Sequence, residues 1–217
     1  MSRRIAFIRH GAYHQKPDTP SALQPFPLTD QGAEEVHRQA KAFTDWCRDS
    51  DQILAPTLQV SPLLRAWQTA AVFAEALELE MHAIDALCER SVGALANLSI
   101  DEIETVLAVD PRHQAPPENW KSDSHYCLPV VGAESLLQAG RRVADHVLAT
   151  AQPNQLTLYV GHGASIRHAA FHLGLLAFDD IARLSMHHAQ PVVLDLDGDG
   201  SPIWGHWKTR HAREALD

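Results

Sequence analysis

Two short apolar segments, each followed at once by a histidine next to glycine, most constrain what this chain can fold into. Residues 5–8 (Ile-Ala-Phe-Ile) precede Arg9-His10-Gly11, and residues 156–160 (Leu-Thr-Leu-Tyr-Val) precede Gly161-His162-Gly163. Apolar runs of this length are typical of strands buried on both faces of a parallel sheet. Because ligands bind at the carboxyl ends of such strands, the sequence predicts that His10 and His162 meet at one rim of the sheet.

Helical patterns separate these strands. Thr29 is a suitable N-cap for a helix over 33–47, and Ser99-Ile-Asp-Glu has the spacing of a capping box for a helix to about Val109. Pro62 after Ser61 predicts a helix to about residue 77, behind a second short strand at 58–60. Further helices are predicted over 134–150 and from about 164. This alternation predicts an α/β fold, a three-layer α/β/α sandwich with a mainly parallel sheet and helices on both faces.

The end of the chain departs from this alternation. Residues 191–196 and 203–207 flank an Asp- and Gly-rich turn and predict a hairpin, which would give the sheet an antiparallel edge. Asp195, Asp197 and Asp199 have the opening spacing of a calcium loop. The twelfth position is His206 rather than Glu, however, and the flanks are typical of strands rather than helices. We therefore interpret the segment as a turn.

The chain of 217 residues, 45% of them hydrophobic, is long enough to bury one sizeable core. We expect a single domain over residues 1–217. Residues 110–132 are polar and rich in Pro, Trp and His, without a helical or strand pattern. An irregular segment of this length is more often functional than accidental, so we expect a lid or insertion there.

The net charge of −9 argues against a nucleic-acid partner, although it permits one basic pocket. No segment approaches the roughly 18 apolar residues that a membrane-spanning helix needs. The three cysteines, an odd number without a Cys-x-x-Cys pair, favour neither a disulfide framework nor a zinc site. We therefore expect a cytoplasmic protein without nucleic-acid or membrane partners, and its oligomeric state stays open.

Phosphate recognition combined with nucleophilic catalysis is the chemistry that the strand ends favour. Arg9 and Arg65 each present a planar fork of donors that matches phosphate oxygens. A neutral imidazole can attack phosphorus and hold the phosphoryl group covalently, as we expect of His10, while His162 would help to neutralise charge. The backbone would be able to approach the ligand closely at two glycines, Gly11 and Gly163.

Four motifs stand in one order between residue 5 and about residue 167. They are Ile8-Arg9-His10-Gly11, Leu28-Thr29-x-x-Gly32, Ser61-Pro62-Leu63-Leu64-Arg65-Ala66-x-Gln68-Thr69-Ala70 and Gly161-His162-Gly163. Together they resemble the histidine phosphatase superfamily, also called the phosphoglycerate-mutase-like family. The resemblance implies an α/β sandwich and a phosphorylated histidine at His10. It also implies a phosphate pocket formed by Arg9, Arg65 and His162, with no metal and no other cofactor.

The candidate general acid comes from the same resemblance. Glu89-Arg90-x-x-Gly93-Ala94-Leu95 is similar to the segment that carries the acid in cofactor-dependent phosphoglycerate mutases. Glu89 would protonate the leaving oxygen and then take a proton from the hydrolytic water. Other carboxylates, such as Glu118, remain alternatives, and Arg90 fits either a pocket or an ion pair.

Residues 12–16 depart from the mutase pattern. After Arg-His-Gly the mutases carry Glu and then Ser or Thr, whereas this chain has Ala12-Tyr13-His14, and Lys16 falls near an expected Asn. The Tyr-His pair is more similar to the mitochondrial mutase-like protein Ser/Thr phosphatases. We therefore predict a phosphatase acting on a phosphorylated small molecule or protein. The alternatives are a phosphoglycerate mutase, a phospho-Ser/Thr or phosphohistidine protein phosphatase, and a non-catalytic phosphate-binding module.

Several residues admit two interpretations. Ser61 fits a helix cap better than a phosphate donor, because Pro62 follows it. Tyr13 and His14 are candidates for substrate binding or for an ordinary polar loop. The remaining candidates are less specific: Trp120, Lys121, His125, His187 and His188.

Overall fold

The computed structural model describes residues 2–210 and contains a five-stranded sheet of order β3-β2-β4-β1-β6. The strands are β1 (Arg4–Arg9), β2 (Leu54–Val60), β3 (Glu80–Ala83), β4 (Leu156–Gly161) and β6 (Pro191–Asp195). Strands β1, β2, β3 and β4 run parallel to one another, and β6 pairs antiparallel with β1. The predicted α/β fold with a mainly parallel sheet and an antiparallel edge is confirmed.

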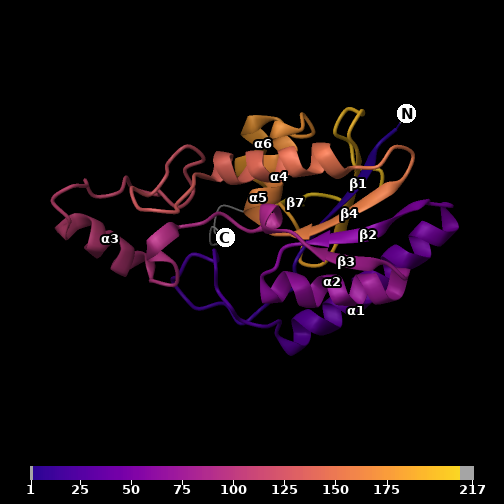
Figure 1. Cartoon of the computed structure of the whole chain (residues 1–217), viewed down its shortest axis with the longest axis horizontal. Helices are drawn as coiled ribbons and strands as arrows, with labels where there is room; N and C mark the ends of the chain where they lie inside the picture. Colours follow the sequence, from indigo (N-terminus) through magenta and orange to yellow (C-terminus); the bar gives the residue numbers. More distant parts are fainter. Residues whose placement is uncertain (1, 211–217) are drawn as a thin grey trace.

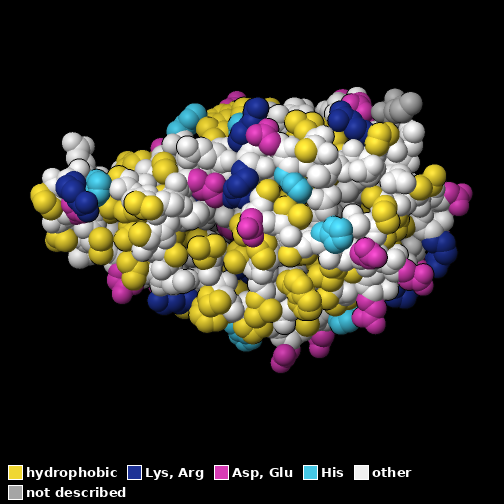
Figure 2. Space-filling view, in the orientation of Figure 1, with side chains coloured by type: hydrophobic (Ala, Val, Ile, Leu, Met, Phe, Trp, Pro, Cys, Tyr) yellow, Lys and Arg dark blue, Asp and Glu magenta, His cyan; other side chains and the backbone are white. Residues whose placement is uncertain are grey.

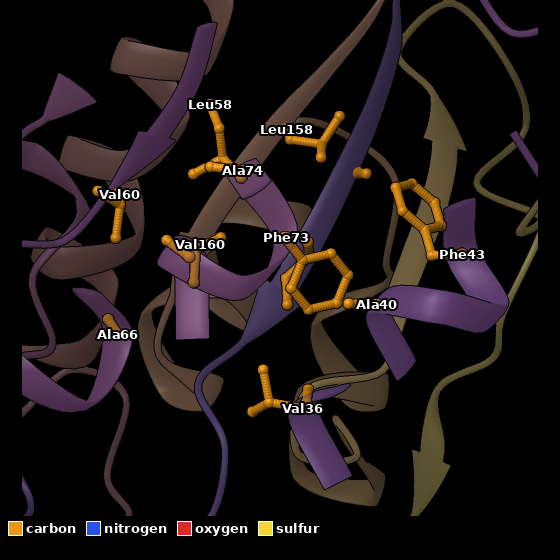
Figure 3. Close-up of a cluster of buried hydrophobic side chains, with 14 of the residues drawn as sticks. Val36, Ala40, Phe43, Leu58, Val60, Ala66, Phe73, Ala74, Leu158 and Val160 are labelled. Carbon is orange, nitrogen blue, oxygen red and sulfur yellow. The ribbon is translucent and has the colours of Figure 1, made fainter. Parts of the chain in front are cut away.

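Helices cover both faces of the sheet (Figure 1). One layer contains α1 (Asp30–Asp49) and α2 (Leu64–Leu77), and the other contains α4 (Leu136–Thr150) and α5 (Gly163–His172). Each layer packs against its own buried apolar cluster. Figure 3 shows the first cluster, in which Phe43 of α1 and Phe73 of α2 lie over Leu58, Leu158 and Val160 of the central strands. Burial of each such side chain contributes about 1.5–3 kcal/mol.

A third apolar cluster lies beyond the end of the sheet. It includes Ile103 and Leu107 of α3 (Ile100–Val109), Trp120 from the irregular segment 110–132, and Ala22. Figure 1 shows α3 and the loop after it extending away from the sheet. Short elements complete the described chain: η1 (Asp85–Leu87), η2 (Gly93–Leu95), α6 (Phe178–Arg183), β5 (Leu184–Ser185) and β7 (Lys208–Thr209). None of the helices within residues 2–210 is long and apolar enough to cross a membrane.

Two of the predicted helix starts are confirmed. The Thr29 hydroxyl accepts a hydrogen bond from the Gly32 amide at the start of α1, and Ser99 forms a complete capping box with Glu102 at the start of α3. The Thr29-x-x-Gly32 spacing has a second physical cause. A Cβ atom at position 32 would lie 2.1 Å from the Ala12 carbonyl oxygen, so only glycine lets α1 approach the loop after His10.

The predicted start of α2 was wrong. The helix begins at Leu64, its N-cap is Leu63 without a side-chain bond, and Pro62 precedes it. Ser61 instead extends the sheet, because its amide donates to the carbonyl of Val160. Its hydroxyl accepts a 3.4 Å hydrogen bond from the amide of Leu63, the N-cap residue of α2, and also lies 2.8 Å from His162 Nε2.

The predicted terminal hairpin was only partly correct. The first arm is β6 and the Asp-rich segment forms a turn, but the second arm pairs through a single bridge between Val193 and Trp204. The chain then turns away to form β7, which pairs with β5. The edge strand β3 was not predicted, because its side chains are largely exposed and lack an apolar pattern.

Close packing of α4 on α5 depends on Gly140. A Cβ atom there would lie 2.3 Å from the Cβ of His168 and 2.5 Å from its carbonyl carbon. We expect Gly140→Ala to lower the free energy of unfolding by about 1–3 kcal/mol, because the two helices must separate. Denaturant unfolding measures this change.

Arg141→Ala is the matched control, since Arg141 is the next residue of α4 and its exposed side chain pairs only with Asp145. Loss of that surface pair should change the free energy of unfolding by less than about 1 kcal/mol. Equal stability of Gly140→Ala and wild type would contradict the packing argument.

Candidate active site

Three strand ends bring the central polar side chains together. Arg9 of β1 pairs with Gly161 of β4, and Val60 of β2 pairs with Val160. One residue further along each strand are His10, Ser61 and His162. The ladder continues past the strands, since the His10 amide donates to the Gly161 carbonyl at 3.0 Å. The backbone register of the sheet therefore fixes the relative positions of these three side chains.

His10 is held in one tautomer and is 3% exposed. Its Nδ1 atom lies 2.7 Å from the Gly11 carbonyl oxygen, which can only accept, so Nδ1 carries the proton. Nε2 is left with a free lone pair. Burial lowers the pKa of His10 well below 6.5, and the nearby charges of His162, Arg65 and Arg9 act in the same direction. His10 is therefore a neutral imidazole at neutral pH.

His162 is fully buried beside His10, with ring centroids 5.1 Å apart. Its Nε2 atom lies 2.8 Å from the Ser61 hydroxyl, while its buried Nδ1 has no hydrogen-bond partner among residues 2–210. Burial lowers the pKa of His162 well below 6.5, and Arg65 and Arg9 lower it further. A buried polar atom without a protein partner costs about 1–3 kcal/mol, so this position of Nδ1 is unfavourable for stability alone.

The two predicted arginines lie on either side of this pair. Arg9 donates to the Met186 carbonyl, and its side chain crosses the start of α5 so closely that a Cβ on Gly163 would lie 3.2 Å from its Nε. Arg65 is fully buried, and its two terminal amino groups donate to the carbonyls of Ser21, Ala22 and Gln24. In this structure Arg65 therefore also fixes the loop over residues 21–24.

Glu89 lies at the amino end of α5. Its carboxylate accepts hydrogen bonds from the amides of Arg90, Ala164 and Ser165. These three donors orient the Glu89 side chain, and two of them belong to the first turn of the helix that follows His162. Glu89 therefore has a helix-capping role in addition to the predicted acid role. Arg90 is buried, which lowers its pKa, and its guanidinium lies 5.7 Å from the centre of the Trp120 ring.

The structure separates Tyr13 from His14. The Tyr13 ring lies edge-on to His10 at 5.3 Å and under the Arg65 guanidinium at 4.6 Å. The His14 side chain is exposed, and the contacts among residues 2–210 do not bring it to His10. Gly11 donates its amide to Thr69 and leaves no room for a side chain against Val36. Tyr13 and Gly11 therefore join the cluster, whereas His14 does not.

His188 also belongs to the cluster, although the sequence analysis placed it among the less specific candidates. Its ring lies 5.7 Å from that of His10, while the adjacent His187 contacts His206. Because β6 is antiparallel to β1, the residues just before β6 lie at the carboxyl end of β1, and the Ala189 amide donates to the Arg9 carbonyl. The predicted antiparallel edge was the one signal that could have located His188 there.

The remaining candidates lie outside this cluster. The Trp120 indole is buried in the third apolar cluster and donates to Glu104, and the exposed His125 contacts Phe178. Lys16 donates to the Asn97 carbonyl. In the turn after β6, Asp195 accepts from Ser2 and Asp197 pairs with Arg3. Residues 2–210 contain no group of three His, Cys, Asp or Glu side chains arranged to hold a metal ion.

Known protein families include one that matches nearly the whole chain. The family model of the histidine phosphatase superfamily (branch 1) matches residues 5–208. The chain belongs to the histidine phosphatase superfamily. This match spans all four sequence motifs and confirms the predicted family.

Relatives within the histidine phosphatase superfamily carry two kinds of name. The 2,3-bisphosphoglycerate-dependent phosphoglycerate mutase of Rhizobium meliloti (strain 1021) is 29% identical over 210 residues, 93% of each chain. Among solved structures, a mycobacterial glucosyl-3-phosphoglycerate phosphatase matches with a TM-score of 0.67 and 20% identity, over 89% of this chain and 90% of that one. The α-ribazole phosphatase of Shigella flexneri matches with a TM-score of 0.66 and 19% identity, over 88% and 90%. At this identity the two structures establish the fold.

Buried neutral histidines make the stability of this protein pH-dependent. Burial lowers the pKa of His168 to about 4 from 6.5. Because the unfolded chain binds the proton first, stability falls as pH drops below about 6.5, by up to about 1.4 kcal/mol per pH unit for each such imidazole. We expect the stability difference between wild type and His168→Asn to shrink between pH 6.5 and 4.

Denaturant unfolding at several pH values measures this difference. Ser124→Ala is the control, because it removes the hydroxyl bonded to His168 Nε2 and keeps the imidazole. It should lower stability while keeping the wild-type slope. A pH-independent difference for His168→Asn would show that His168 does not contribute to the slope.

Proposed function

We propose that this enzyme hydrolyses phosphomonoesters through a phosphohistidine on His10. The observation that supports this most is the state of the His10 imidazole: neutral, with Nδ1 bound to a carbonyl and Nε2 carrying a lone pair. Two arginines and a second buried imidazole surround it. Such a set is suited to attack on a dianionic phosphoryl group, because cations offset the charge repulsion of the incoming phosphate.

In the first step, His10 Nε2 attacks phosphorus, an N–P bond forms, and the bond to the leaving oxygen breaks. Arg9 and the Nδ1–H of His162 would donate to the phosphoryl oxygens. The Ser61 hydroxyl lies 2.8 Å from His162 Nε2, and in the tautomer in which it donates to Nε2 the His162 proton is on Nδ1. In the second step water attacks phosphorus, the N–P bond breaks, and His10 returns to its neutral form.

Arg65 would join phosphate binding only by exchanging partners. Its terminal amino groups are bonded to backbone carbonyls of the loop over residues 21–24. A phosphoryl dianion is a stronger acceptor than a carbonyl, so it would draw at least one of these donors away. Even without that exchange, the Arg65 charge lies near enough to lower the pKa of both histidines.

The first test is hydrolysis of an aryl phosphate in the presence of a chelator. We expect turnover by wild type and at least a 10³-fold loss in His10→Ala, because the variant lacks the attacking nitrogen. Quenched wild-type reactions should contain an acid-labile, base-stable phosphoryl adduct that His10→Ala does not form. The exposed residue His14 supplies the control, and His14→Ala should retain turnover.

Equal turnover by wild type and His10→Ala would sink the proposal. Phosphate binding without an adduct would instead identify a non-catalytic binding module.

A second test separates the acid role of Glu89 from its helix-capping role. If Glu89 protonates the leaving oxygen, Glu89→Gln should lower kcat about 10²–10⁴-fold for an alkyl phosphate and much less for a nitrophenyl phosphate, which needs no proton. A cap alone predicts equal effects on both substrates, together with a stability loss of about 0.5–2 kcal/mol. The ratio of the two kcat changes decides between the roles.

Phosphoglycerate mutase activity is the second candidate, and the 29% identity to a named mutase favours it. The same phospho-His10 would then return its group to a bound intermediate rather than to water. Incubation of the phosphoenzyme with 2-phosphoglycerate distinguishes the two: isomerised product indicates a mutase, and release of inorganic phosphate indicates a phosphatase.

A further inference from the structure

The segment that carries Glu89 has almost no regular structure of its own. It follows the edge strand β3 as the short helix η1 and continues through residues 88–91 without helix or strand. A functional side chain on such a segment is placed precisely only if other elements hold its backbone. Glu89 is nevertheless buried, and two amides of α5 bind its carboxylate. The contacts that fix the backbone on either side of Glu89 therefore deserve a functional explanation.

Arg142 of α4 holds the backbone before Glu89. Its Nη1 atom donates to the carbonyl oxygens of Ala86 at 2.8 Å and Cys88 at 3.2 Å, and it lies 3.4 Å from that of Asp85. These carbonyls belong to η1 and to the residue after it, where a helix end leaves acceptors without partners of its own. Arg142 thus fixes the residue directly before Glu89.

Glu134 holds the backbone after Glu89. Its Oε1 atom accepts from the Ser91 amide at 3.0 Å, and its own amide donates to the Ser91 carbonyl at 3.0 Å. Glu134 is itself well placed, because the next residue, Ser135, forms a complete capping box with Gln138 at the start of α4. The residue two positions after Glu89 is therefore tied to α4 as well.

Arg142 and Glu134 also pair with each other. Nε of Arg142 donates to Oε2 of Glu134 at 3.2 Å, and Nη2 donates to Oε1, which is the forked geometry that arginine forms with carboxylates. On the face shown in Figure 2, Lys and Arg side chains are dispersed among acidic ones, and exposed pairs of that kind contribute little. The Arg142 and Glu134 side chains are only 29% and 19% exposed. Together they form one bridge that spans Glu89 from residue 88 to residue 91.

The helix layer that holds this bridge also holds the Glu89 carboxylate. Gly140 lets α4 pack closely on α5, and the first-turn amides of α5 bind the carboxylate. One pair of packed helices therefore fixes both the backbone and the side chain of Glu89. Such control is needed by a proton donor, which must lie within about 2.6–3.2 Å of the oxygen that it protonates. A displacement of about 1 Å can cost about 10²-fold in rate.

We infer that the Arg142–Glu134 ion pair positions Glu89 for proton transfer to the leaving oxygen. The two residues act through the backbone of residues 85–91 rather than by touching the substrate. The inference rests on the proposed function, in which Glu89 is the proton donor, and it adds two positioning residues that lie outside the histidine cluster.

The test measures kcat/KM for a nitrophenyl phosphate divided by kcat/KM for an alkyl phosphate. Only the alkyl substrate needs a proton on its leaving oxygen, so displacement of Glu89 should slow that substrate selectively. We expect Arg142→Gln to raise the ratio at least about tenfold. A purely structural role would change both substrates alike and leave the ratio at its wild-type value.

Two further variants separate geometry from charge. Arg142→Lys keeps the positive charge but loses the fork of donors, so it should raise the ratio nearly as much as Arg142→Gln. The Arg142 charge also lowers the pKa of His162, and a wild-type ratio in Arg142→Lys would assign Arg142 to that charge effect instead. Glu134→Gln keeps an acceptor for the Ser91 amide and should raise the ratio by a smaller factor. These two variants decide the question if Arg142→Gln does not fold.

Arg141→Gln is the matched control, because Arg141 is the neighbouring residue of α4 and its exposed side chain pairs with Asp145. It should leave the ratio unchanged. The double variant Glu89→Gln/Arg142→Gln should have the same ratio as Glu89→Gln alone, since no acid is left to position. Turnover of the nitrophenyl substrate shows that each preparation is folded.

A wild-type ratio in the Arg142 and Glu134 variants would overturn the positioning role. A further rise of the ratio in the Glu89→Gln background would also overturn it, because Arg142 would then act through another group. Equal effects of Glu89→Gln on both substrates would remove the acid itself and the inference with it. In each case His10-dependent turnover of the nitrophenyl phosphate would leave hydrolysis through phospho-His10 standing, whereas loss of that dependence would count against the proposed function.

Discussion

The parallel pairing of β1 and β2 with β4 is the constraint on which the rest of the structure depends. The three strands end within one residue of one another along the ladder, so the next residue of each lies at the same rim. The ladder hydrogen bonds continue for one residue beyond β1 and β2, which fixes the Cα positions of His10 and Ser61 relative to β4. The backbone therefore holds the two imidazoles and the hydroxyl in fixed relative positions, as the proposed attack on phosphorus would require.

Two helix layers pack on the sheet through their apolar clusters, and glycines let each layer make one especially close approach. Gly32 lets α1 contact the loop after His10, and Gly140 lets α4 contact α5 at His168. In both cases the missing side chain brings a helix within contact distance of backbone next to the active site. The motif Leu28-Thr29-x-x-Gly32 therefore matters for the position of His10, although none of its residues touches the histidine pair.

The predictions from sequence agree with the structure where burial produces an apolar pattern, and they fail where a contact joins residues that are distant in sequence. The central strands and the caps at Thr29 and Ser99 were predictable, since apolar runs and capping residues act locally. The edge strand β3 was not, because an exposed strand has no apolar alternation. For Ser61 the sequence indicated only the local contact: its hydroxyl accepts from the Leu63 amide before α2, but it also bonds to His162, about a hundred residues away, which no local helix signal could indicate.

Arg65 shows the same limit of prediction from sequence, because its partners are set by the tertiary structure. The motif led us to expect Arg65 to bind phosphate, yet its guanidinium donates to backbone carbonyls of the loop over residues 21–24. The path of that loop depends on the whole fold. Burying a guanidinium without acceptors would be costly, and the loop carbonyls supply those acceptors. The positive charge remains beside His10, where it lowers the pKa of that imidazole. Burial and the nearby cations thus act in one direction on the two imidazoles, since both lower their pKa and keep them neutral.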